Sequence, residues 1–111
     1  MDELIYASAM SIAQAIRDKD ISAVDVVEAH LRRIDAVNPS LNAVVQLCAE
    51  RWLGEARDAD AALAGGVSPR TLQGVPMTLK DSLDTEGITS TWGTKGRASF
   101  MPEQDSTVVA R

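Results

Sequence analysis

Residues 72–82 read Leu-Gln-Gly-Val-Pro-Met-Thr-Leu-Lys-Asp-Ser, so a glycine opens a short apolar run that ends in a lysine beside an aspartate. The run has the length of a strand, and its aliphatic residues predict one over about 75–79. A lysine ammonium is strongly hydrated and is normally kept in water. Lys80 at the end of a buried strand would therefore indicate chemistry. At the end of an edge strand, Lys80 would instead discourage pairing with other chains.

Three segments earlier in the chain carry the capping residues and the apolar spacing of amphipathic helices. These predicted helices cover about 9–17, 23–37 and 49–64. The second is expected to end at Asn38-Pro39, because proline interrupts a helix. The third collects its apolar side chains on one face, which is expected to be core: Trp52, Ala56, Ala59 and Leu63. His30, at the edge of the apolar stripe of the second helix, is expected to be structural, since no second polar group is placed to orient it.

Two further segments complete the predicted organisation. Residues 42–47 are short and partly β-branched, which predicts another strand. Asp105 is a capping residue before a Val-rich segment, so a helix is expected to begin at about 106. Two or three strands among helices give the fold class α/β. Two strands are too few for an independent sheet, so residues 1–111 are expected to be the N-terminal fragment of a single larger domain.

Composition and charge limit the classes of function. The chain has 111 residues, of which 45% are hydrophobic and 24% charged, as in a globular domain. Its net charge of -5, without a basic block, predicts no electrostatic binding to nucleic acid or anionic lipid. The single cysteine, Cys48, cannot form an internal disulfide. The acidic start, and the absence of an apolar run of about 20 residues, predict a cytoplasmic protein that does not span a membrane.

The block around Lys80 resembles the amidase signature family of serine amidohydrolases. The match lies in Gly74-Val75-Pro76, three small or aliphatic positions, and then Lys80-Asp81. It continues in residues that the family shares after the lysine and at the end of the chain, namely Asp84, Gly87, Thr91, Gly93 and 105–111. The chain departs from the family at Ser82, where asparagine is common, and at Trp92, where a small residue is common. Trp92 would either line an acyl pocket or pack the loop onto a sheet.

That resemblance implies a large mixed β-sheet covered by helices, and a small-molecule amide substrate hydrolysed without a metal or an organic cofactor. It implies that Lys80 is the base of a Ser-cisSer-Lys triad that works through an acyl-enzyme. An amine accepts a proton only when neutral, yet an ordinary lysine has a pKa of about 10.4. Burial and neighbouring hydroxyls are expected to lower that pKa. Asp81 would oppose this effect, so its carboxylate is expected to turn away and bond backbone.

The bridging and nucleophilic serines of the resembled family lie in a Gly/Ser-rich run beyond the lysine. No such run occurs before Arg111, and the serines that follow the lysine lack that context: Ser82, Ser90 and Ser99. Residues 1–111 alone are therefore predicted to be inactive, because removing triad members causes a severe loss of catalytic rate.

Two other functions stay open from the sequence. The glutaminase subunit of a tRNA-dependent amidotransferase shares the same block of residues. A non-catalytic helical interaction module is the alternative from another class. The first two predicted helices carry apolar faces that could pair between copies of the chain, so a homodimer is one assembly that the sequence allows. The amide substrate itself is not determined by these residues.

Overall fold

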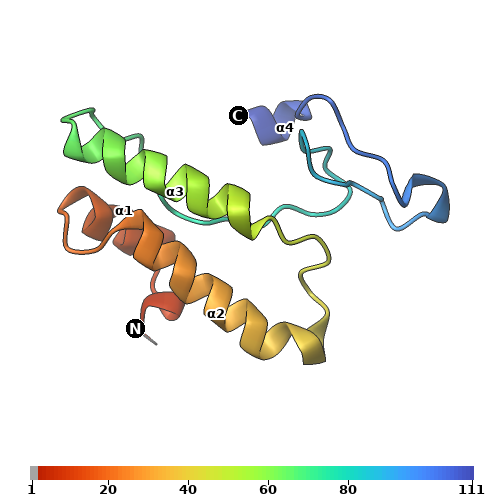
Figure 1. The fold of residues 1–111 in the computed structure, drawn as a ribbon, viewed down its shortest axis with the longest axis horizontal. Coiled ribbons are helices and arrows are strands. Elements are labelled where there is room, and N and C mark those ends of the chain that lie inside the picture. The colour runs from red at the N-terminus through yellow and green to blue at the C-terminus, as the bar shows by residue number, and fades with distance from the viewer. Residues whose placement is uncertain (1–2) are drawn as a thin grey trace. The chain divides into compact units, whose positions relative to one another are not determined.

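The computed structural model describes residues 3–111, which divide into two compact units. The helical unit comprises residues 3–44 and 49–76, and the loop unit comprises 45–48 and 77–111. In Figure 1 the elements of the helical unit are a 3-10 turn at Leu4–Tyr6, α1 at Ala9–Arg17, α2 at Ala23–Leu41 and α3 at Ala49–Ala64. Those of the loop unit are a 3-10 turn at Lys95–Arg97 and the short α4 at Thr107–Ala110. The bounds of α1 and α3 coincide with those that the sequence predicts.

Side chains satisfy the first amide groups of the helices. The Ser22 hydroxyl accepts a hydrogen bond from the Asp25 N–H at 3.0 Å, and the Asp25 side chain bonds back to the backbone of Ser22 in a capping box. The carboxylate of Asp60, on α3, accepts the N–H groups of Ala23 at 2.7 Å and Val24 at 3.1 Å. A carboxylate at this position also interacts favourably with the positive end of the helix dipole. Asp60 therefore caps α2 and fastens it to α3.

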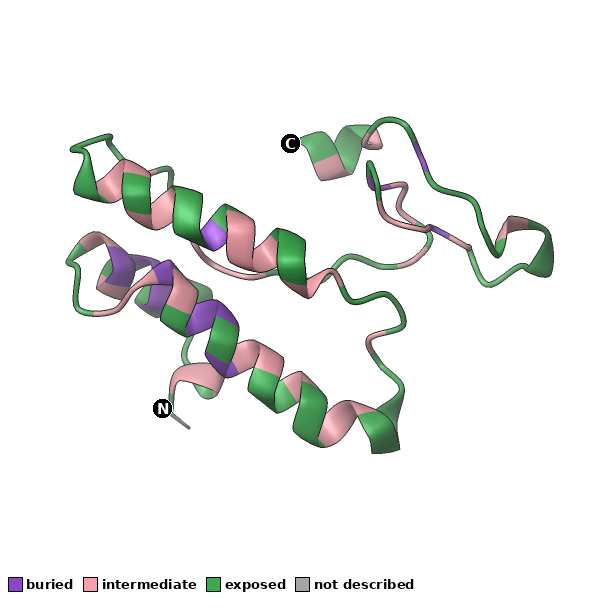
Figure 2. Ribbon diagram, in the orientation of Figure 1, coloured by how far each residue is buried: buried purple, intermediate pink, exposed green. Residues whose placement is uncertain are grey.

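An apolar core lies between the helices of the helical unit, as the buried segments in Figure 2 show. Its buried members come from α1, α2 and α3: Ile12, Ile16, Ala23, Val26, Val27 and Ala56. The face of α3 that the sequence predicts as core does pack here, because Trp52, Ala59 and Leu63 lie against this cluster. Val75 also packs onto it, so the start of the apolar run is held by the core.

Gly74 is required at its position for two reasons. Its φ of +83° lies in the left-handed region that side chains rarely adopt, and a Cβ there would lie 2.9 Å from the Cβ of Ala23. The glycine that opens the apolar run thus lets the chain pass close against the start of α2.

The structure corrects the predicted end of the second helix. α2 continues through Pro39 to Leu41, and Asn42 then ends it with a φ of +50°. Proline removes one backbone donor, but the next turn still closes, because the Asn42 N–H donates to the Asn38 carbonyl at 2.7 Å. A single lost bond in the last turn is therefore not enough to stop the helix there.

The predicted strands are not formed: residues 3–111 contain no strand, and their isolated β-bridge joins Thr85 and Ile88. A strand needs a hydrogen-bonded neighbour. In 42–47, the N–H and carbonyl of Val44 bond instead to the side chain of Asn38, at 2.9 and 3.0 Å. In 75–79, the side chain of Met77 is 65% exposed. The strands expected for the α/β fold class are therefore absent from the described residues, which are mainly helical.

Candidate functional site

Lys80 lies in the loop unit, where the chain turns after the apolar run. Its carbonyl accepts a hydrogen bond from the N–H of Leu83 at 2.9 Å, which closes a turn. Its side chain is exposed rather than placed at the end of a buried strand. The described residues thus fix the backbone of Lys80 but do not themselves bury its amine.

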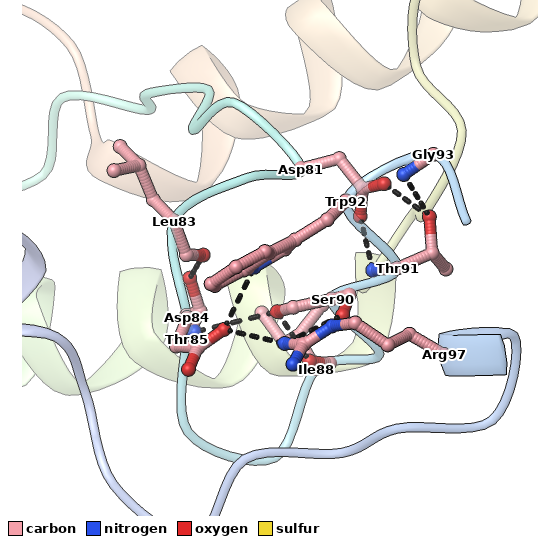
Figure 3. A network of polar contacts seen from close by, with 10 residues as sticks. All are labelled: Asp81, Leu83, Asp84, Thr85, Ile88, Ser90, Thr91, Trp92, Gly93 and Arg97. Carbon is pink, nitrogen blue, oxygen red and sulfur yellow. Dashed lines mark hydrogen bonds and ion pairs between the residues drawn. The ribbon is translucent and has the colours of Figure 1, made fainter.

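The carboxylate of Asp81 is hydrogen-bonded to Thr91, ten residues later in the chain. One carboxylate oxygen accepts the backbone N–H of Thr91 at 2.9 Å, and the other accepts the hydroxyl of Thr91 (Figure 3). The Thr91 hydroxyl oxygen accepts in turn the N–H of Gly93 at 3.1 Å. This is the backbone-directed orientation that the sequence predicts for Asp81. The hydroxyl and then the N–H of Thr91, with smaller help from the N–H groups of Gly93 and Trp92, lower the pKa of Asp81 against a smaller opposing effect of burial.

A second polar cluster surrounds the guanidinium of Arg97. The guanidinium lies 4.1 Å from the ring centre of Trp92 and 4.0 Å from that of Phe100, so it is stacked between two aromatic faces. It donates to Asp84 at 3.0 Å and to the carbonyl of Ser90 at 3.3 Å, and the indole N–H of Trp92 donates to the same Asp84 oxygen at 3.1 Å. Figure 3 shows the guanidinium of Arg97 and the indole of Trp92 both reaching Asp84.

Backbone contacts join two stretches of the loop unit in antiparallel directions. The N–H of Gly87 donates to the Pro102 carbonyl at 3.1 Å, and the N–H of Ser90 donates to the Phe100 carbonyl at 2.9 Å. The N–H of Ser106 reaches the Asp84 carbonyl at 2.9 Å. These bonds hold residues 84–90 against residues 100–106, and so hold the segment that carries Thr91.

Two sequence expectations at this site are wrong: the packing of Trp92 onto a sheet and the capping of the last helix by Asp105. Trp92 neither packs onto a sheet nor lies buried: it is 53% exposed, with a φ of +56°, and it stacks on Arg97. Asp105, expected to cap the last helix, accepts the N–H of Glu86 at 2.8 Å, and Ser106 occupies the capping position without a side-chain bond. Arg97 carried no sequence signal, because its partners Asp84 and Trp92 are set by the fold of the loop.

Within residues 3–111, no group of three or more acidic, histidine or cysteine side chains is arranged to hold a metal ion. The helices described over the same residues are also too short or too polar to cross a bilayer.

Comparison with known proteins places this arrangement in a family. A family model described as Amidase matches residues 25–111. The chain belongs to the amidase family. The matched range includes Lys80, Asp81 and the whole of the loop unit.

Curated relatives of this amidase chain are similar along nearly all of its length. A glutamyl-tRNA(Gln) amidotransferase subunit of Carboxydothermus hydrogenoformans is 41% identical over 98% of the chain, and one of Acidothermus cellulolyticus is 40% identical over all of it. The chain spans only 22% of the length of each of these relatives. Their whole activity therefore involves much more protein than these 111 residues.

A solved structure shares the backbone arrangement of the amidase chain. It is reported as "An unexpected vestigial protein complex reveals the evolutionary origins of an s-triazine catabolic enzyme". The likeness has a TM-score of 0.88 and 30% sequence identity, and it covers 94% of this chain and 23% of that one. Most of the backbone of this chain thus has a counterpart in that solved structure.

Proposed function

We propose that the intact protein carrying this chain hydrolyses a carboxylic amide, with Lys80 as the base that activates a serine hydroxyl. The observation that carries the proposal is the family match over residues 25–111, within which Lys80 stands at a backbone position fixed by the turn to Leu83. The rest of the intact protein is expected to supply the serines and to bury the amine, which lowers the pKa of a lysine.

The relatives favour one form of this reaction over a stand-alone amidase. Those of Carboxydothermus hydrogenoformans and Acidothermus cellulolyticus are both named as a subunit of a glutamyl-tRNA(Gln) amidotransferase. We therefore propose as first candidate that the intact protein releases ammonia from an amide donor such as glutamine and works within an assembly of several chains. Contact with tRNA would then be made by the assembly, since this chain has a net charge of -5.

A stand-alone amidase is the second candidate. It is supported by the Amidase family model over residues 25–111, which is not specific to an amidotransferase subunit. The similar solved structure does not favour this candidate, because its description concerns a protein complex. A stand-alone amidase would act on a small amide without partner chains.

The test of the chemistry uses ammonia release by the intact protein from two probes, L-glutamine and propionamide. Lys80→Met is expected to abolish turnover of whichever probe the wild type accepts, because methionine cannot take a proton. Lys95→Met is the matched control: Lys95 lies on an exposed 3-10 turn and is expected to be replaceable. Full turnover in Lys80→Met would remove the proposal.

Two measurements separate the candidates. Co-purification of partner chains with glutamine-dependent ammonia release supports the amidotransferase, whereas turnover of propionamide by a protein that purifies alone supports the amidase. The 111-residue chain assayed by itself is expected to be inactive with both probes. Turnover by that chain, lost in Lys80→Ala, would contradict the expectation that further residues supply the nucleophile.

A further inference from the structure

The carboxylate of Asp81 is the one charged group placed directly beside Lys80 in the sequence, and the fold turns it to another part of the loop unit. Both of its oxygens are engaged by Thr91, one by the N–H at 2.9 Å and the other by the hydroxyl. The same hydroxyl oxygen receives the Gly93 N–H, so its donor and acceptor functions are both used. Two hydrogen bonds therefore join the Asp81 carboxylate to Thr91.

Two contacts restrain the backbone around Lys80: the Asp81–Thr91 pair at the next residue, and the hydrogen bond from the Leu83 N–H. The Leu83 N–H holds the Lys80 carbonyl at 2.9 Å. The Asp81 side chain, one residue along, is tied to a segment ten positions away. Both contacts restrain the backbone at Lys80, from which its exposed side chain projects.

The segment that supplies Thr91 is itself held in an uncommon conformation. Trp92 has a φ of +56° and Gly93 a φ of +74°, so two successive residues lie in the left-handed region. For a bulky residue such as tryptophan this conformation is unfavourable, and it persists only where surrounding contacts impose it. The Asp84 and Arg97 contacts of the Trp92 ring supply that restraint.

We infer that Asp81 and Thr91 are a positioning pair for Lys80, which fixes the place from which the amine meets its hydroxyl partner. The inference rests on the proposed function, because it requires that Lys80 be the base. Neither residue is assigned contact with substrate. Their effect on the reaction passes through the geometry of Lys80, and small misplacements of a reacting group cost about 100-fold in rate.

The test compares three threonine variants of the intact protein, using whichever of L-glutamine or propionamide it turns over. Thr91→Val keeps the shape and the backbone N–H but removes the hydroxyl, and it is expected to lower kcat by roughly 10- to 100-fold with KM within about twofold. Thr91→Ser retains the hydroxyl and is expected to recover kcat to within about threefold of wild type. Thr94→Val is the matched control, because the side chain of Thr94 is exposed and makes no capping bond, and it is expected to match wild type.

Asp81→Asn provides a second route if Thr91→Val does not fold. It keeps the side-chain shape but replaces one acceptor oxygen by a donor, so it is expected to reduce kcat as Thr91→Val does. The double variant is expected to lose no more than the larger single loss, since the two residues act as one unit. Multiplicative losses would overturn the pairing.

The outcomes also separate this inference from the function on which it rests. If Lys80→Met is inactive while Thr91→Val keeps the kcat of wild type, Lys80 is the base and the positioning pair is refuted. If Lys80→Met stays active, the proposed function fails first. A change confined to KM in Thr91→Val would also refute positioning, because it would assign the residue to substrate binding.

Discussion

The helical unit and the loop unit are stabilised by different forces. In the helical unit, side chains of three helices bury one another, and Val26 is fully buried among them. In the loop unit, the buried side chains include the polar Thr85 and Ser90, and the chain path is fixed by hydrogen bonds to Asp81, Asp84 and Arg97. Apolar burial is roughly proportional to area and tolerates small shifts, whereas each polar bond depends on its direction. The candidate site lies in the loop unit, so its geometry depends on the direction of individual hydrogen bonds.

The fluorescence of the two tryptophans can be used to follow the two units separately. Trp52 packs against the core of the helical unit, and Trp92 stacks on Arg97 in the loop unit. In the 111-residue chain, which has two tryptophans, Trp92→Phe therefore leaves a reporter of the helical unit alone, and Trp52→Phe leaves a reporter of the loop unit.

The largest effect is expected from a cavity in the apolar core. Ile16→Ala, at a side chain only 3% exposed, is expected to lower the free energy of unfolding by about 2–5 kcal/mol. Urea unfolding followed by Trp52 emission in a Trp92→Phe background measures it. Met10→Ala, on the same helix but 57% exposed, is the control and is expected to change little. Equal losses in the two variants would contradict the assigned core.

A smaller loss is expected where the apolar run meets the start of α2. Gly74→Ala combines an unfavourable left-handed φ with a 2.9 Å approach to Ala23, and it is expected to cost about 2–4 kcal/mol. Gly66→Ala has a similar φ of +80° but no atom within 4 Å, so it is expected to cost about 1–2 kcal/mol. The difference between their urea midpoints isolates the steric contact. Equal midpoints would show that the contact relaxes.

In the loop unit, Arg97→Lys is expected to cost about 1 kcal/mol locally. Lysine keeps the charge near Asp84 but loses the planar stacking between Trp92 and Phe100. The expected observation is a change in the fluorescence emission of Trp92 in a Trp52→Phe background. The far-UV circular dichroism of the helices is expected to be retained, because the long helices lie in the helical unit. Loss of that helix signal would mean that the units do not respond separately.

The smallest effect is expected from acid. The pKa of Asp81 is lowered in the fold, so its contribution to stability is present above the unfolded value of about 3.9 and is lost as the pH falls through the folded value. Thr91→Val removes the largest cause and is expected to move this loss to higher pH. The Trp92 emission of Trp52→Phe protein, titrated with and without Thr91→Val, measures the difference. Identical titrations would show that Thr91 does not set the ionisation of Asp81.

The starts of α1 and α2 could be predicted from the sequence because their causes are local. Ser8 accepts the N–H of Ser11 three residues later, and Ser22 and Asp25 cap each other across the same spacing. The end of α2 could not, because the side chain of Asn38 was free to bond Val44 and the turn after Pro39 still closed. The strands failed for a related reason: an extended segment becomes a strand only beside a partner.

The candidate site divides in the same way. The sequence alone determined that Lys80 and Asp81 stand next to each other after an apolar run, and it predicted that the Asp81 carboxylate would bond to backbone. Only the tertiary structure decided that Thr91 receives this carboxylate and that Arg97 lies between Trp92 and Phe100. A cap or an apolar face is set by residues three or four positions apart, which a sequence displays. A hydrogen bond across ten residues depends on the path of the loop between them, and that path exists only once the chain has folded.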